Sequence, residues 1–218
     1  MKRIENIEKL AQHNQNLANH ESELAKKEKH LAKKLKLRTK ARKILIKKEL
    51  EIAEIRKSLA KKNQELVNKK LEISQENIIN FPEKLMNHEK DYTLFNEKLA
   101  ENLIDLSKLS LKVTDLEEII ANIKEKLAEN NLKIAKIRNI LAKQQYKYAQ
   151  ALKSHPNNQE IVKMEMDYLN TEKDLKKIYN DRERDTKDLI KKKEELTDLS
   201  KKISLNLAER ENIRLHDI

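Results

Sequence analysis

Apolar residues recur along this chain every seven positions, in three separate series. The first series is Leu10, Leu17, Leu24, Leu31, Leu45, Ile52, Leu59, Leu66 and Ile73, with one interruption at Arg38. The residue after each member is small or apolar, as in Ala11, Ala18, Ala25, Ala32, Ile46 and Ala53. Neighbouring residues lie about 100° apart on a helix. The pattern therefore predicts a helix with a two-edged apolar stripe that is able to contact two different partner helices.

Two further series follow. The second is Leu85, Tyr92, Leu99, Leu106, Val113, Ile120, Leu127, Ile134, Leu141 and Tyr148, and apolar partners three residues later complete the spacing of a coiled-coil seam. The third is Ile161, Tyr168, Leu175, Leu189, Leu196 and Ile203, with a polar interruption at Arg182. Since the second segment is the most apolar, we expect it to be the central helix.

The only two prolines fall between the series, in "NIINFPEKL" (77–85) and "KSHPNNQEI" (153–161). Proline ends or restarts a helix, and Asn80 with Glu83 and Asn157 with Glu160 resemble capping boxes. The alternative is a proline kink within one continuous rod. Turns at both prolines predict helices over about 1–79, 82–153 and 157–218. The predicted fold is all-α: a long, elongated, antiparallel three-helix coiled-coil bundle forming a single domain over 1–218.

Polar residues occupy the position between the two edges of the first stripe: Asn14, Glu21, Glu28, Arg42 and Glu49. Such groups are costly in a dry core unless they are paired. We therefore expect this helix to bury less than the others, or to bury its surface against a second copy. The sequence predicts a homodimer that shares the first helix or a face of the second.

The composition excludes several kinds of site. The chain has no glycine, so it has no phosphate-binding glycine loop, dinucleotide fingerprint or nucleophile elbow. His13 and His20 are seven residues apart, too far along a helix to chelate one metal. No acid–base pair stands out, so we expect no enzyme activity, no metal and no cofactor. Without a long apolar run or a secretory signal, the expected location is cytoplasmic, with peripheral membrane contact as an option.

Positive charge is concentrated in residues 26–48. This segment contains one acidic residue, Glu28, and its net charge of +11 equals that of the whole chain. Its twelve basic residues are Lys26, Lys27, Lys29, Lys33, Lys34, Lys36, Arg38, Lys40, Arg42, Lys43, Lys47 and Lys48. Antiparallel pairing would place them beside about 113–135, whose charge is close to neutral, so we expect the bundle to leave them uncancelled. They form either a solvated face or a site for a polyanion.

Two polyanions are candidates for this basic patch. An anionic membrane attracts basic residues near its surface, and nucleic acid would be held by phosphate contacts alone. "RTKARK" (38–43) is faintly similar to the basic region of bZIP proteins, but the base-reading asparagine pattern is missing. The sequence therefore disfavours sequence-specific DNA binding.

The order of long helix, short turn, long helix, polar tip and shorter helix resembles the BAR-domain superfamily, including its eisosome-like members. The most similar segment is "YKYAQALKSHPNNQEIVKMEMDYLNTEKDLKKI" (146–178). The resemblance implies a crescent-shaped homodimer whose basic face binds and curves anionic membranes, with residues 26–48 contacting lipid. No amphipathic N-terminal wedge is evident.

The leading functional prediction is accordingly a BAR-like, non-enzymatic scaffold that binds anionic membrane lipids as a homodimer. The first alternative is a structural coiled-coil rod of cytoskeletal, filament or secretion-stalk type that binds other coiled-coil proteins. The second is a nucleic-acid binder without sequence preference.

Overall fold

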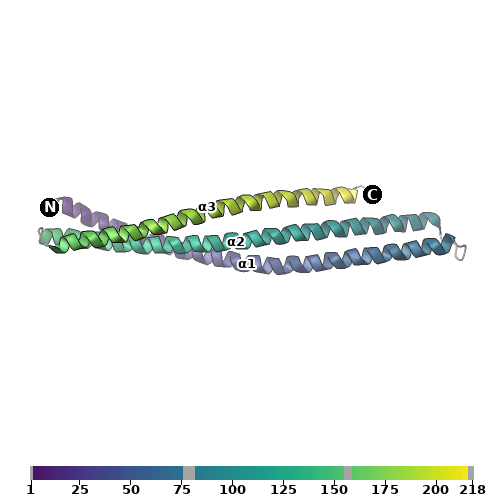
Figure 1. Ribbon diagram of the computed structural model, residues 1–218, viewed down its shortest axis with the longest axis horizontal. Coiled ribbons are helices and arrows are strands. Elements are labelled where there is room, and N and C mark those ends of the chain that lie inside the picture. The colour runs from purple at the N-terminus through teal and green to yellow at the C-terminus, as the bar shows by residue number, and fades with distance from the viewer. Residues whose placement is uncertain (1, 76–81, 155–158, 216–218) are drawn as a thin grey trace. The chain divides into compact units, whose positions relative to one another are not determined.

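The computed structural model describes residues 2–75, 82–154 and 159–215, and these residues form three α-helices (Figure 1). They are α1 (Lys2–Gln75), α2 (Glu83–Ser154) and α3 (Gln159–Leu215). No strand occurs within these ranges. The predicted all-α, three-helix fold is confirmed. The predicted end of the first helix, near residue 79, lies outside the described residues.

The chain reverses direction on both sides of α2. Lys70 Nζ lies 3.0 Å from Glu89 Oε2, although a continuous helix would separate residues 19 positions apart by roughly 28 Å. Likewise, the Tyr148 hydroxyl donates a hydrogen bond of 2.8 Å to Glu165 Oε1, only 17 residues later. The helices are therefore antiparallel neighbours, and the alternative of one kinked rod is excluded.

Proline marks the start of α2 as predicted. The Pro82 carbonyl accepts hydrogen bonds from the backbone N–H groups of Leu85 and Met86, at 3.0 and 3.2 Å. These contacts satisfy two donors of the first helical turn, which have no partner inside the helix. The predicted capping boxes stay predictions because Asn80 and Asn157 lie outside the described residues.

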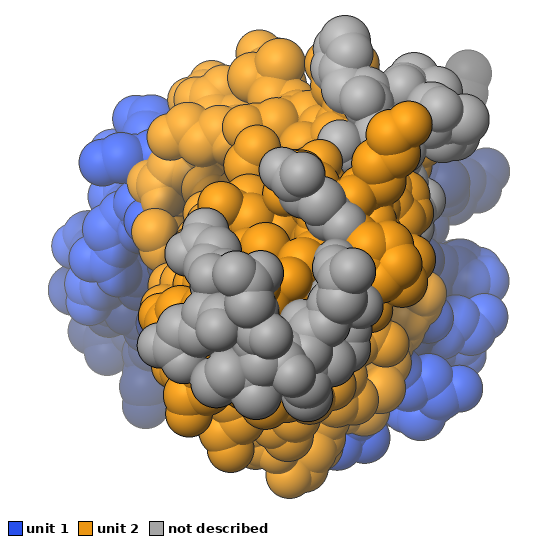
Figure 2. Space-filling model, turned by 90° about the vertical axis from the view of Figure 1, so that its right-hand side faces the viewer, with its two compact units in different colours: residues 1–37, 119–193 blue, residues 38–118, 194–218 orange. Residues whose placement is uncertain are grey.

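The chain divides into two compact units, coloured separately in Figure 2. Unit 1 comprises residues 1–37 and 119–193, and unit 2 comprises 38–118 and 194–218. Each unit takes a segment from all three helices. Within each, α2 contacts both other helices. Glu129 and Asn130 make these contacts in unit 1, and Glu117 and Asn102 make them in unit 2. The predicted central place of the second helix therefore holds in each unit, whereas the single domain stays a prediction.

Small residues fill the contact between α1 and α2. The core of α1 consists of Ala11, Ala18, Ala25, Ala32, Thr39, Ile46, Ala53, Ala60 and Val67. The matching column of α2 is Met86, Thr93, Ala100, Ser107, Thr114, Ala121, Ala128, Ala135, Ala142 and Ala149. Both columns repeat every seven residues and are at most 8% exposed. Short side chains let two helix backbones approach closely, so this contact is an alanine-rich coiled coil.

The Leu edge of α1 is less buried than the alanine edge. The alanine edge is buried against α2, but the leucines lie largely in solvent. In unit 1, Leu10 and Leu24 border hollows that residues of α3 also line, so the Leu edge lies beside α3 there but is only partly covered. The reason is geometric, because the closest helix contact is made by the smaller residues and leaves the longer ones beside it.

Candidate functional site

The first candidate surface is the exposed Leu edge of α1, here called the leucine stripe. It comprises Leu10, Leu17, Leu24, Leu31, Leu45, Ile52, Leu59, Leu66 and Ile73, which are 37–64% exposed. Singly exposed leucines are ordinary on protein surfaces, but large contiguous apolar patches mark interaction sites. The stripe supplies one apolar residue per heptad, whereas a coiled-coil seam has two, and most residues three and four positions after its members are polar.

In unit 1 the leucine stripe borders open hollows. Leu10 lines one of about 430 Å³ together with Tyr148 of α2 and with Tyr168 and Leu169 of α3. Leu24 lines a hollow of about 230 Å³, and Leu31 lines another of about 360 Å³. These hollows are concave, partly apolar and next to the stripe, so they extend the exposed surface.

The polar residues beside the stripe have partners on α2. Asn14 donates to Gln145 Oε1 at 3.5 Å, and Glu28 accepts a hydrogen bond of 3.0 Å from Asn131. Glu21 is paired with Arg138, and that guanidinium also donates to the Tyr179 hydroxyl at 2.5 Å. Pairing removes much of the cost of burying these groups. It also fixes the rotation of α1, with its polar positions toward α2 and its leucines outward.

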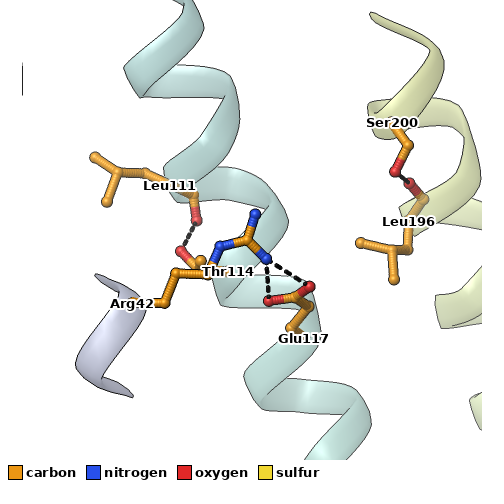
Figure 3. Close-up of polar contacts among 6 residues, drawn as sticks. All are labelled: Arg42, Leu111, Thr114, Glu117, Leu196 and Ser200. Atoms are coloured by element: carbon orange, nitrogen blue, oxygen red, sulfur yellow. Dashed lines mark hydrogen bonds and ion pairs between the residues drawn. The ribbon is translucent and has the colours of Figure 1, made fainter. Parts of the chain in front are cut away.

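Arg42 shows the same arrangement in unit 2 (Figure 3). Its Nη1 donates to both carboxylate oxygens of Glu117, at 3.0 and 3.2 Å. Nearby, the buried Thr114 hydroxyl donates to the Leu111 carbonyl at 2.8 Å, within α2. Ser200 makes the corresponding bond to the Leu196 carbonyl on α3. The buried Thr114 hydroxyl is thus satisfied inside α2, as is that of Thr93, which donates to the Lys90 carbonyl at 2.8 Å.

The second candidate surface is the basic patch of residues 26–48, and part of it is neutralised. Four of the twelve basic residues pair with carboxylates of α2. Lys29 lies 2.8 Å from Glu129, Lys36 4.0 Å from Glu125, Arg42 3.0 Å from Glu117 and Lys43 2.5 Å from Asp115. A fifth, Lys48, pairs with Glu51 on α1 itself.

The expectation that the bundle leaves this charge uncancelled is therefore wrong for those four residues. Residues 113–135 are nearly neutral in total, as predicted, but Asp115, Glu117, Glu125 and Glu129 lie on the side that meets α1. The arrangement of charge around α2, and not its sum, decides the pairing.

Two of these ion pairs shift the pKa of their lysine, and one also shifts the pKa of its carboxylate. A hydrogen bond to Glu129 raises the pKa of Lys29, and the same bond lowers the pKa of Glu129 below 4.5. A hydrogen bond to Asp115 raises the pKa of Lys43. These groups are charged at neutral pH and are occupied with one another, so they are poorly available to an external anion.

The seven remaining basic residues are exposed and form no ion pair with any residue that the structure describes. In unit 1 they are Lys26, Lys27, Lys33 and Lys34, and in unit 2 they are Arg38, Lys40 and Lys47. Lys26 and Lys33 are one heptad apart, as are Lys40 and Lys47, so each pair shares one side of the helix. We call these seven residues the free cations.

No group of three or more His, Asp or Glu side chains that could hold a metal occurs among residues 2–75, 82–154 and 159–215. Within the same ranges, no helix has an apolar stretch long enough to cross a bilayer. The chemistry that the described surfaces offer is thus apolar contact along the leucine stripe and attraction of anions by the free cations.

Comparison with known proteins adds no assignment. No protein-family model matches the sequence, and no curated protein matches it.

Proposed function

We propose that this protein is a non-enzymatic helical scaffold that binds anionic membrane surfaces through the free cations of α1. The observation that carries the proposal is the division of the basic patch. The half-buried Lys29, Lys36 and Lys43 pair with α2, whereas seven exposed cations have no carboxylate partner among the described residues. Each basic residue near an anionic leaflet contributes roughly 1 kcal/mol.

The proposal concerns each unit by itself. Unit 1 offers four free cations and unit 2 offers three, in both cases on α1. Aliphatic stems of lysine adapt to an uneven surface, and the ammonium groups act as point charges, which suits a fluid layer of headgroups. The resemblance to BAR domains motivates the same proposal but is independent of the ion pairs.

The test is sedimentation with liposomes. Changing Lys33, Lys34, Lys40 and Lys47 to Glu lowers the charge of residues 26–48 by eight, from +11 to +3. Glutamate is a good helix former, so helicity should be unchanged. We expect wild-type protein to pellet with phosphatidylserine liposomes and the variant to stay in the supernatant. Binding of the wild type should weaken as salt shortens the screening length from about 10 Å at 0.1 M to about 3 Å at 1 M.

A matched control changes the net charge equally at a different place. Lys163, Lys173, Lys176 and Lys191 are exposed on α3 and form no ion pair with a described residue. Their reversal to Glu should leave most liposome binding intact. Equal loss in both variants would show that only total charge matters and would refute the patch. A DNA shift assay on the same proteins tests the nucleic-acid alternative, which predicts a retarded band that the α1 variant loses.

A second function is supported by a separate observation, the exposed leucine stripe. It favours the structural coiled-coil alternative, in which α1 binds another apolar helix. A wild-type protein that stays in the supernatant with phosphatidylserine liposomes would favour this function over membrane binding.

A further inference from the structure

We infer that α1 inserts an apolar ridge of unit 2 into the anionic membrane surface, beside the cations that are attracted to it. The ridge consists of Ile44 and Ile55, with Leu45, Ile52 and Leu59 of the leucine stripe along one edge. All five residues belong to unit 2. This insertion rests on the proposed membrane binding, to which it adds an apolar contribution.

The two isoleucines of the ridge point away from α2. Ile46 and Ala53 are only 5% and 3% exposed at the contact between α1 and α2. Ile44 precedes Ile46 by two positions, Ile55 follows Ala53 by two, and a step of two residues turns a helix by about 200°. Ile44 and Ile55 therefore lie nearly opposite the contact with α2, where they are 65% and 67% exposed.

The ridge is a contiguous apolar surface. Ile44 and Ile55 are 11 positions apart, which is close to three full turns and about 16 Å along the helix. Ile52 and Leu59 lie one turn before and one turn after Ile55, and Leu45 adjoins Ile44. All five side chains are more than half exposed. Large contiguous apolar patches mark sites of contact with a protein or a membrane.

Basic side chains flank the ridge. The free cations Lys40 and Lys47 lie one turn before and one turn after Ile44, and the exposed Arg56 lies one turn after Ile52. An apolar face with basic neighbours is typical of a helix that lies in the membrane interface. Its apolar side chains enter the boundary between headgroups and acyl chains, while the long basic side chains reach the phosphates.

The balance of unpaired charge favours an anionic membrane over the groove of another protein. Residues 38–62 contain ten basic and three acidic residues. Four of the basic residues pair with α2, and Lys48 pairs with Glu51 at 2.7 Å. The residues that form no ion pair within the described chain are five basic ones and two acidic ones: Arg38, Lys40, Lys47, Arg56 and Lys62, with Glu49 and Glu54. A protein would need an apolar groove with an acidic rim, whereas an anionic bilayer offers both chemistries at any position.

The first experiment removes the ridge without changing the charge. Ile44→Gln with Ile55→Gln alters only exposed side chains, and glutamine is a good helix former, so helical circular dichroism should be unchanged. We expect the affinity for phosphatidylserine liposomes to fall at least about tenfold, because two inserted apolar side chains are lost. The dependence of the affinity on salt should stay that of the wild type, because the cations are unchanged.

The matched control is Leu85→Gln with Leu205→Gln. These leucines are 55% and 71% exposed in unit 2 and lie outside the ridge, on α2 and α3. The control variant should bind phosphatidylserine liposomes as the wild type does.

The second experiment locates Ile55 relative to the bilayer. The chain has no cysteine, so Ile55→Cys introduces the only thiol, which can carry an environment-sensitive fluorophore. On phosphatidylserine liposomes its emission should shift to the blue and be quenched by nitroxides attached to the acyl chains. The same label on Leu205→Cys should remain unquenched. Without liposomes, the label at residue 55 should report an aqueous environment.

The outcomes separate the ridge from the proposed function. Wild-type protein that stays in the supernatant overturns membrane binding and the ridge together. If the wild type pellets but the Ile44/Ile55 variant binds equally well, or if the label at residue 55 is not quenched, only the ridge is overturned and binding is electrostatic. A label that is already blue-shifted without liposomes would show that protein covers the ridge, and would also overturn it.

Discussion

At the scale of single residues, the ion pairs between α1 and α2 set which cations are occupied. In unit 2, Lys57 lies 2.7 Å from Glu101, and this hydrogen bond is the main reason that the pKa of Glu101 is lowered. In unit 1, Lys29 has the same effect on Glu129. Each pair is exposed to solvent, so each contributes modestly to stability and mainly fixes the antiparallel register.

These two carboxylates predict a pH dependence of stability. Their ordinary pKa is 4.5 and their folded pKa is lower, so the folded state binds fewer protons than the unfolded state in this range. Their contribution is complete above pH 4.5 and is lost as the pH falls through the folded pKa. We expect Glu101→Gln with Glu129→Gln to reduce the fall in urea midpoint between about pH 7 and about pH 3.

The control for this titration is Glu23→Gln with Glu54→Gln, since both residues are exposed and form no ion pair with a described residue. These changes should leave the acid dependence close to that of the wild type. If both double variants titrate alike, the ion pairs of Glu101 and Glu129 do not contribute to stability.

At the scale of helices, the contact between α1 and α2 depends on side-chain size. Ala32 and Ala128 line the same hollow and are 5% and 1% exposed, and the surrounding members of both columns are similarly small. An alanine contact buries little apolar area per residue, but it permits close backbone approach and many dispersion contacts. The same closeness leaves the leucine stripe outside the contact.

A larger side chain in this contact should therefore be destabilising. We expect Ala128→Leu to lower the free energy of unfolding by about 1–3 kcal/mol, because it forces the two helices apart. Ala41→Leu is the matched control, since Ala41 is exposed on α1 and leucine has similar helix propensity. Urea unfolding at neutral pH measures both. An Ala128→Leu variant as stable as the wild type would contradict close packing at this position.

At the scale of the whole molecule, the two candidate surfaces are chemically independent but share α1. The leucine stripe is apolar, whereas the free cations Lys26, Lys33, Lys40 and Lys47 lie on another side of the helix. A dimer would therefore carry two sets of free cations into one particle. Two linked binding surfaces bind more tightly than either alone, because the second contact is intramolecular.

This combination predicts an avidity effect. If the homodimer predicted from the sequence forms through the first helix, Leu17→Gln with Leu24→Gln should yield a monomer. That monomer should still bind phosphatidylserine liposomes with the salt dependence of the wild type, but at least several-fold more weakly. The Lys33, Lys34, Lys40 and Lys47 variant should remain dimeric while it loses liposome binding. Liposome titrations beside sedimentation equilibrium measure both properties. Unchanged liposome affinity in a monomeric variant would show that pairing adds nothing to membrane binding.

The sequence by itself determined the helices and their order. Heptad spacing, the absence of glycine and the positions of Pro82 and Pro156 predicted three antiparallel helices, because helix formation and chain reversal are governed by local residues. From the polar positions Glu21 and Glu28 the sequence predicted a less buried helix or contact with a second copy, whereas both side chains have partners on α2 of the same chain. The small-residue column of α2 was missed, although Ala121, Ala128 and Ala135 repeat at the same period as the leucines that drew attention.

Only the tertiary structure decided which surfaces of α1 are covered. The Leu and Ala edges have the same period, so the sequence could not show which edge would be buried. Packing places the smaller residues at the closest helix contact. In the same way, the near-neutral charge of residues 113–135 did not reveal that Glu117 and Glu129 face α1. Burial and pairing depend on the rotation of each helix about its axis. That rotation is set by contacts between residues far apart in the chain.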